Sequence, residues 1–274
     1  TVVVGYDGSP SAQAALRYAG AHAGADGRVV AVHGYEPGDR YLLPDLPLGA
    51  HPIPLNADAD LSNEGIAHLI ADFLEALDLR DVVLVHSDWG GGLLLTALGR
   101  DERIGRLVIL PSTAFDNFPP GLPGKAATVA ARLPGLTLGL RALRIGAVRR
   151  LPILFGRMAR DVPDATMRAW TRPAIEDPLI RRDLLKHARA PFDRADLVRG
   201  TEALRAFTGD ALVLWIADGT VMPRDHGRRL ADLLPRGRLV ELADCYVLAM
   251  IDSPRTVADE LSAFLAESAP ARRD

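Results

Sequence analysis

Val85-His86-Ser87-Asp88-Trp89-Gly90-Gly91 is the stretch that decides the fold, because it lies between two apolar runs of different period. Residues 81–85 read as a buried strand, and the run from 92 to 99 begins as a helix. A carboxylate at a strand-to-helix corner, followed by an aromatic residue and glycines, matches a nucleophile elbow. Small residues let the two backbones approach, and the corner turns the next N–H groups toward a developing oxyanion. Asp88 is therefore the candidate nucleophile, and an Asp in this role forms an alkyl ester.

Strand-like and helix-like segments alternate on both sides of this corner. We expect strands at 2–4, 28–33, 82–85, 106–110, 211–216 and 238–242, and helices at 11–23, 61–77, 93–98, 197–207, 224–234 and 255–264. This order predicts an α/β fold with a mostly parallel, doubly wound sheet. Residues 115–196 show no strand, only short helical patches between prolines. We therefore predict an α/β core at 1–114 and 197–274, with a helical cap inserted at 115–196.

Composition limits the classes of partner. The 274 residues are 48% hydrophobic and carry a net charge of −3, with acidic and basic side chains interspersed apart from short clusters such as Arg149-Arg150 and Arg181-Arg182. This predicts a small-molecule substrate or ligand, with no nucleic acid and no membrane as partner. The single Cys245 excludes an internal disulfide and a cysteine metal cluster, and we expect neither metal nor cofactor. The chain opens on a strand and has no long apolar run, which predicts a cytoplasmic protein. It gives no indication of oligomeric state.

Residues 41–265 resemble the α/β-hydrolase superfamily, and within it the haloalkane dehalogenase and epoxide hydrolase branch. The resemblance rests on PDLPLGAH at 44–51, DWGG at 88–91, RIGRLVIL at 103–110, AFDNFPP at 114–120 and LVLW at 212–215. It implies a hydrolase with an Asp nucleophile, an acid and a histidine base. Asp88 occupies the nucleophile position, although an Asp before a helix is also a common N-cap.

The other two catalytic positions implied by the resemblance are altered. The acid is expected four residues before Pro223, where Gly219 stands. Asp218, next to it, or Asp116, after the preceding strand, could supply the acid instead. The histidine is expected at Val247, and a valine cannot deprotonate water. His86, where the family has a glycine, is the base candidate nearest to Asp88.

Four residues are candidates for substrate binding. In dehalogenases a Trp after the nucleophile donates its indole N–H to the leaving halide, and Trp89 matches it. His33-Gly34, followed by an aromatic and a proline, resembles the oxyanion-loop signature of hydrolases, and it equally fits the end of a stress-protein strand. Trp170 is the cap aromatic with an N–H, with packing as the alternative role. These residues imply a small, neutral, largely apolar substrate.

Residues 1–37 resemble a different family. VVVGYDGSPSA at 2–12 is similar to the opening of a universal stress protein, in which an Asp at the position of Asp7 lies near bound ATP. The glycine-rich phosphate loop of that family is not present in the sequence. Three hypotheses follow: a hydrolase acting through Asp88, a non-catalytic small-molecule-binding or scaffold protein with a degenerate hydrolase site, and an adenine-nucleotide-binding stress protein.

Overall fold

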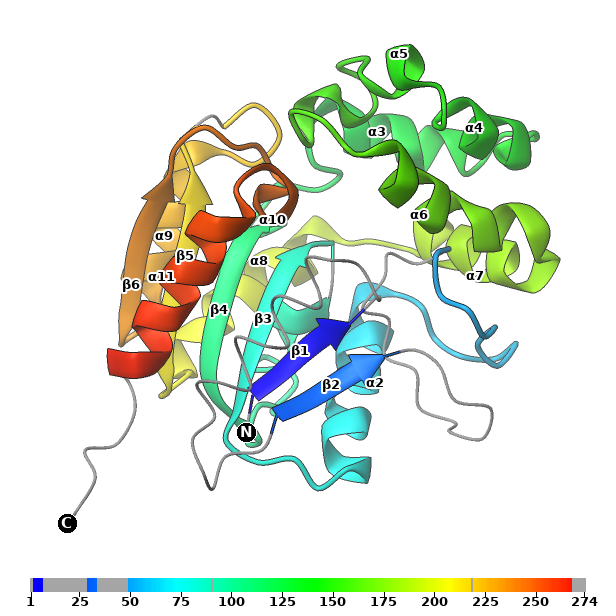
Figure 1. Ribbon diagram of the computed structural model, residues 1–274. Helices are drawn as coiled ribbons and strands as arrows, with labels where there is room; N and C mark the ends of the chain where they lie inside the picture. The colour runs from blue at the N-terminus through cyan, green and yellow to red at the C-terminus, as the bar shows by residue number, and fades with distance from the viewer. Residues whose placement is uncertain (1, 7–28, 34–48, 90, 218, 268–274) are drawn as a thin grey trace.

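All strands in the described part of the chain pair in parallel. The computed structural model describes residues 2–6, 29–33, 49–89, 91–217 and 219–267 (Figure 1). A four-stranded sheet has the order β3-β4-β5-β6, and β1 pairs with β2 in a second sheet. Because β1 also contacts β3, the two sheets lie side by side. The strands are β1 (Val2–Tyr6), β2 (Val29–His33), β3 (Val82–Asp88), β4 (Ile104–Ser112), β5 (Asp210–Ile216) and β6 (Gly237–Leu242).

From β2 onward, helices and 3-10 turns alternate with the strands, as the pattern predicts; the helix expected at 11–23 lies outside the described residues. These helices and turns are α2 (Asn63–Ala76), η1 (Gly91–Leu94), α8 (Arg194–Glu202), η3 (Ala203–Ala206), α9 (Arg224–Leu233), α10 (Ala249–Asp252) and α11 (Pro254–Glu267). The core lies along the central strands, where the side chains from Ala211 to Ile216 in β5 are all buried. Such continuous burial is typical of a parallel strand covered on both faces.

The start of α2 shows how local sequence places an element. The hydroxyl of Ser62 accepts a hydrogen bond from the N–H of Gly65 at 3.0 Å, which satisfies one N–H that a helix start leaves free. Phe73 and Leu74 are buried, as the apolar periodicity predicts. Leu77 is exposed because it is already the C-cap residue. The helix expected at 61–77 is therefore confirmed, with Ser62 as its N-cap.

A separate group of helices lies beyond the carboxyl ends of the strands (Figure 1). It contains α3 (Gly121–Ala130), α4 (Leu136–Ala142), α5 (Gly146–Arg149), η2 (Phe155–Arg157), α6 (Asp164–Glu176) and α7 (Pro178–Arg189). In this part of the chain, which the structure describes without a gap, there is no strand. The domain limits at 115 and 196 stay a prediction. Within the described ranges, no helix combines the length and the apolar character needed to cross a membrane.

The predicted limits of two helices were wrong. Instead of a helix at 93–98, a 3-10 turn covers Gly91–Leu94 and further turns follow. Glycine is a poor helix former, and His86 packs directly against Gly92. The helix expected at 197–207 begins earlier, because the Asp193 carboxylate accepts from the N–H of Ala195 at 2.8 Å and caps it. It also ends earlier, in η3, because Phe207 is extended.

Candidate active site

The backbone turns sharply after β3. Asp88 pairs with Ser112 of β4 and is the last residue of its strand, and η1 begins at Gly91. Directly before the corner, His86 is buried, and a Cβ added to Gly92 would lie 2.5 Å from its Nδ1 atom. The contact explains why a glycine is needed at 92 when a histidine occupies 86.

His86 is held neutral by its surroundings. Its Nε2 atom is buried and has no hydrogen-bond partner among the described residues. Burial lowers the pKa of His86 to about 4, because the apolar interior disfavours the charged imidazolium. His86 is also absent from the residues that line the nearby cavity. Whether His86 acts as a base stays a prediction.

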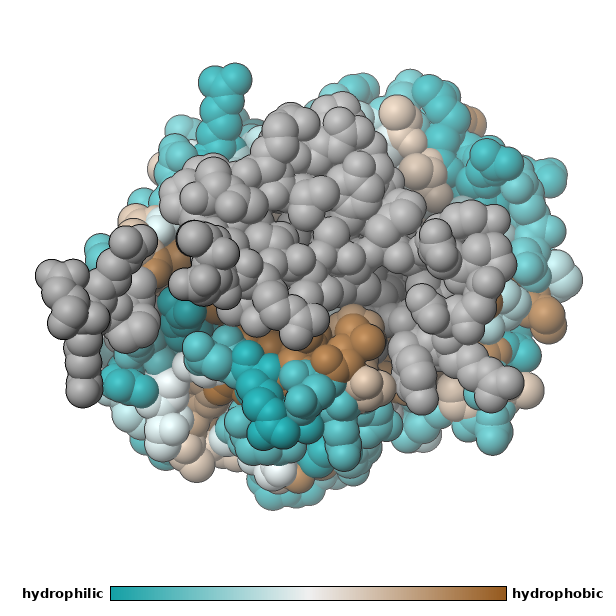
Figure 2. Space-filling model, turned by 60° about the horizontal axis from the view of Figure 1, so that its bottom comes forward, coloured by the Kyte–Doolittle hydropathy of each residue, from teal (hydrophilic) through white to brown (hydrophobic). Residues whose placement is uncertain are grey.

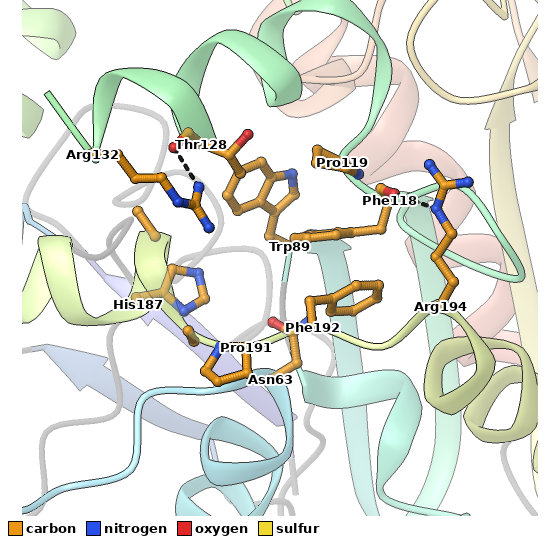
Figure 3. A pocket seen from close by; sticks show the side chains of 12 residues that line it. Asn63, Trp89, Phe118, Pro119, Thr128, Arg132, His187, Pro191, Phe192 and Arg194 are labelled. Carbon is orange, nitrogen blue, oxygen red and sulfur yellow. Dashed lines mark hydrogen bonds between the residues drawn. The ribbon is translucent and has the colours of Figure 1, made fainter.

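A cavity of about 290 Å³ opens beside this corner. Its walls come from the strand corner, from the start of α2 and from the helices beyond the sheet (Figure 3). The lining residues are Asn63, Trp89, Phe118, Pro119, Thr128, Arg132, His187, Ala188, Ala190, Pro191, Phe192 and Arg194. A cavity that gathers distant parts of the chain and is largely apolar is the usual form of a small-molecule site.

Aromatic rings form one wall of the cavity. Trp89 contributes its ring from the corner, with its centroid 5.3 Å from that of Phe118. The Phe118 ring in turn stacks on Phe192, at a centroid distance of 3.8 Å (Figure 3). Stacked and tilted rings at these distances attract one another and give a stiff apolar surface. Of these three aromatic residues, only Trp89 was predicted from the sequence to bind substrate.

The wall of the cavity contains a histidine, His187. Its Nδ1 atom lies 2.8 Å from the carbonyl oxygen of Leu61, and because a carbonyl can only accept, Nδ1 carries the proton. The Nε2 atom is then the basic nitrogen of the ring. Burial lowers the pKa of His187, and the hydrogen bond to Leu61 opposes this in part, which favours the neutral form. The ring centroid lies 6.1 Å from that of Trp89.

Two arginines lie at the rim of the cavity, one on each side (Figure 3). Arg132 donates to the carbonyl oxygen of Thr128 at 2.7 Å, and Arg194 donates to that of Phe118 at 3.1 Å. Both side chains are exposed. They hold the rim in place through the backbone and keep further N–H groups available to a polar end of a ligand.

Comparison with known proteins identifies the family. The model of the Alpha/beta hydrolase family matches residues 13–260. The chain belongs to the alpha/beta hydrolase family. A 2-hydroxymuconate semialdehyde hydrolase of Pseudomonas sp. (strain CF600) is 25% identical over 237 residues, which cover 84% of this chain and 77% of the relative.

Solved hydrolase structures share the fold. The meta-cleavage product hydrolase CumD of Pseudomonas fluorescens IP01 has a TM-score of 0.64 at 19% identity and covers 98% of this chain and 91% of its own. The haloalkane dehalogenase DatA of Agrobacterium tumefaciens C58 has a TM-score of 0.64 at 19% identity, with 97% and 90% covered. At these identities the likeness establishes the alpha/beta hydrolase fold.

Gly219, at the position where the resemblance led us to expect the acid, has no carboxylate. A Cβ added to Gly219 would lie 2.5 Å from the backbone N of Arg224, so the chain is closed tightly around the glycine. Asp218 lies outside the described residues. Asp116 is exposed and interacts electrostatically with His226, whose pKa is lowered mainly by burial. Asp116 is not among the residues that line the cavity.

Val247, at the position where the resemblance led us to expect the base, is part of the apolar core. Val247 has no exposed surface, and the next N–H, that of Leu248, donates to the carbonyl of Met158 at 2.8 Å. Cys245 in the same loop is buried, which raises the pKa of its thiol to about 11 and keeps it protonated. This loop is fastened to the helices beyond the sheet instead of presenting an imidazole.

The other predicted binding residues are placed as follows. Trp170 packs beside Phe155 at a centroid distance of 6.3 Å and does not line the cavity, which agrees with the packing alternative. His33 ends β2, and Gly34 lies outside the described residues. Among the described residues, no group of three His, Cys, Asp or Glu side chains could hold a metal ion.

The resemblance of residues 1–37 to universal stress proteins receives no support from the comparisons. The match to the hydrolase family begins at residue 13, inside this segment. The parallel pairing of β1 with β2 fits both kinds of fold, because both are built from parallel strand–helix–strand units. Asp7 lies outside the described residues.

Proposed function

We propose that this protein is a hydrolase of small, largely apolar substrates and that Asp88 is its nucleophile, in a haloalkane dehalogenase-like reaction. The observation that carries the proposal is the cavity whose aromatic wall begins at Trp89, the residue directly after Asp88. The ring cluster suits an alkyl group, and 290 Å³ suits a substrate of a few carbon atoms. An indole N–H next to the nucleophile suits a leaving halide.

The proposed reaction has two steps. The Asp88 carboxylate attacks the carbon that bears the halogen, the carbon–halogen bond breaks, and an alkyl ester and a halide ion form. A water molecule then adds to the ester carbonyl and gives its proton to Nε2 of His187. Collapse of the adduct releases an alcohol and restores the carboxylate, and the proton leaves His187 for solvent. Neutral His187, with its proton fixed on Nδ1, has the form that such a base needs.

A series of 1-haloalkanes tests the proposal through halide release and intact-protein mass. We expect the wild-type protein to release halide repeatedly and Asp88→Ala to release none. We expect His187→Gln to release about one equivalent and to gain the mass of the alkyl group, because ester formation needs no base and ester hydrolysis does. If the wild-type protein neither releases halide nor gains mass with any member of the series, the proposal fails.

A second candidate function is binding of the same ligands without turnover. It is favoured by Gly219 and Val247, which leave the family's acid and base positions without ionisable groups. In that case 1-haloalkanes would raise the melting temperature of both the wild-type protein and Asp88→Ala, with no halide released from either.

A further inference from the structure

One stretch of the chain contains no acidic residue at all. Residues 117–160 carry eight lysines and arginines and no aspartate or glutamate over 44 positions. The rest of the chain then carries 24 basic against 35 acidic side chains. The expectation that the charges are interspersed was therefore wrong. The net charge of −3 is the sum of +8 for residues 117–160 and −11 for the rest of the chain.

This stretch builds the outer layer of the molecule beyond the sheet. It contains α3, α4, α5 and η2, which Figure 1 shows on the side away from the strands. α3 contacts α7, and α4 contacts α6, so each of the two longer helices has an inner side. Their other sides face outward.

The outward sides of α3 and α4 repeat one pattern. In α3, Leu122, Lys125 and Val129 are exposed at spacings of three and four residues, which places them on one helical face. Leu138 and Arg141 in α4, with Ile145 just after it, have the same spacing and are also exposed. Leu138 is 72% exposed, an unusual position for a leucine.

The same stretch of the chain has further exposed aliphatic residues. We call the whole set the basic cap surface: Leu122, Lys125, Val129, Leu133, Leu138, Arg141, Ile145, Leu151 and Ile153. Among the described residues, neither Lys125 nor Arg141 has a carboxylate within 4.0 Å. By contrast, Arg150 pairs with Asp161 at 3.0 Å and Arg160 pairs with Asp244 at 3.0 Å. The cations of the basic cap surface are thus not neutralised within the fold.

We propose that the basic cap surface binds the surface of an anionic lipid bilayer. Aliphatic side chains between unpaired cations, on faces that turn away from the protein, are what interfacial helices use. The cations approach lipid headgroups while the leucines, valine and isoleucines enter the boundary with the acyl chains. Binding of this kind needs no helix that crosses the bilayer, and it is independent of the reaction proposed for Asp88.

Two other partners could cover this surface, a second copy of the chain or a nucleic acid, and charge and composition argue against both. A symmetric dimer through this surface would bring Lys125 and Arg141 of both copies together, and no residue of the basic cap surface is acidic. Nucleic acid also attracts cations, but single strands additionally need exposed aromatic rings for base stacking. The two aromatic side chains of this stretch, Phe118 and Phe155, are not exposed. The excess of acidic residues in the rest of the chain also orients the molecule, because it is repelled by an anionic surface.

Vesicle sedimentation tests the proposal with the full chain. The probes are vesicles of phosphatidylcholine alone and of phosphatidylcholine mixed with phosphatidylserine. The test variant combines Lys125→Ser, Leu138→Ser and Arg141→Ser. The control variant combines Arg228→Ser, Leu77→Ser and Arg255→Ser, which removes the same charge and one exposed leucine from the core helices. Circular dichroism melting of both variants verifies that they fold.

We expect the wild-type protein and the control variant to sediment with the mixed vesicles and not with phosphatidylcholine alone. The test variant should bind at least about 25-fold more weakly, since it loses two cations and each cation near an anionic leaflet contributes about a factor of five. Absence of sedimentation with the mixed vesicles would overturn the proposal, and so would equal binding by the test variant. Retention of a duplex oligonucleotide, or dimerisation in light scattering, together with no vesicle binding would assign the surface to those partners instead.

Discussion

His86 directly precedes the corner after β3, and its effect is local. The imidazole is buried against Gly92, and its Nε2 atom has no hydrogen-bond partner among the described residues. A buried polar atom without a partner destabilises the folded state by an amount similar to a lost hydrogen bond. The neutral form reduces this penalty, because a buried imidazolium would be worse.

The stability of the protein should therefore depend on the protonation of His86. Its pKa falls from 6.5 to about 4 on folding, so between these values the unfolded chain binds more protons and stability decreases as the pH falls. Full passage through this range amounts to about 3 kcal/mol. Urea unfolding at about pH 7 and pH 5 should show a smaller decrease for His86→Leu than for the wild-type protein. Equal decreases would contradict the assignment.

Gly219 is a second residue whose identity is fixed by close packing. We expect Gly219→Asp to lose about 1–3 kcal/mol of stability, because any Cβ there meets the backbone N of Arg224. Gly219→Ala should lose a similar amount, which identifies the Cβ and not the charge as the cause. As a matched control, Gly139→Ala in α4 should gain about 0.5–1 kcal/mol, since nothing lies within 4 Å of its new Cβ. Thermal unfolding measures all three, and a fully stable Gly219→Asp would refute the argument.

Among the elements, α7 is the one that presents His187 to the cavity, and a buried carboxylate holds it in place. Asp183 accepts hydrogen bonds from the N–H of Leu55 at 2.8 Å and from Nε2 of His51 at 3.2 Å. His51 in turn accepts from the N–H of Gly49, which fixes the tautomer. The segment after residue 48 is thereby joined to α7.

Removal of this carboxylate should loosen α7. Asp183→Ala leaves the N–H of Leu55 and the imidazole of His51 without a buried partner, and we expect a loss of about 3–5 kcal/mol. Asp183→Asn keeps one acceptor oxygen and should lose less. Urea unfolding gives both values. If Asp183→Ala were as stable as the wild-type protein, the hydrogen bonds of Asp183 with Leu55 and His51 would make no net contribution to stability.

The sequence predicts an element well when interactions between neighbouring residues form it, and poorly when contacts between distant residues do. The strands and α2 follow from local periodicity and a local cap, and the sequence predicted them closely. The corner after Asp88 was predicted, but the 3-10 turn at Gly91–Leu94 in place of a helix was not, because His86 contacts Gly92 only once the strand and the turn have packed together. In the region between α3 and α7, prolines indicated short helices, but periodicity alone could not set which faces turn inward.

The residues of the candidate site are likewise predictable from the sequence only where they belong to one contiguous motif. Trp89 could be found because it belongs to a contiguous motif. His187 and Phe192 lie about a hundred positions further along the chain, and only the packing of α7 against the core brings them to the cavity. No spacing in the sequence marks such a pair. Nothing in the sequence indicated the tight packing around Gly219 and Val247, because it depends on how the chain folds around them.

At the scale of the molecule, the cavity exists because two parts of the chain meet, and Phe192 is a wall contributed by the segment after α7. We expect Phe192→Ala to weaken binding of an apolar 1-haloalkane about fivefold to tenfold, because a stacked ring is removed from the ligand surface. Leu179→Ala, at the exposed start of α7, is the matched control and should bind as the wild-type protein does. Isothermal calorimetry gives both affinities, and equal values for the two variants would remove Phe192 from the site.

The burial of Val247 has a consequence for engineering this protein. A histidine introduced at 247 would enter the hydrophobic core, in a loop whose Leu248 N–H donates to the carbonyl of Met158. The polar side chain would disturb this junction between two layers of the fold. Designs that add an ionisable group should therefore begin at residues that already line the cavity, where a side chain can change without opening the core.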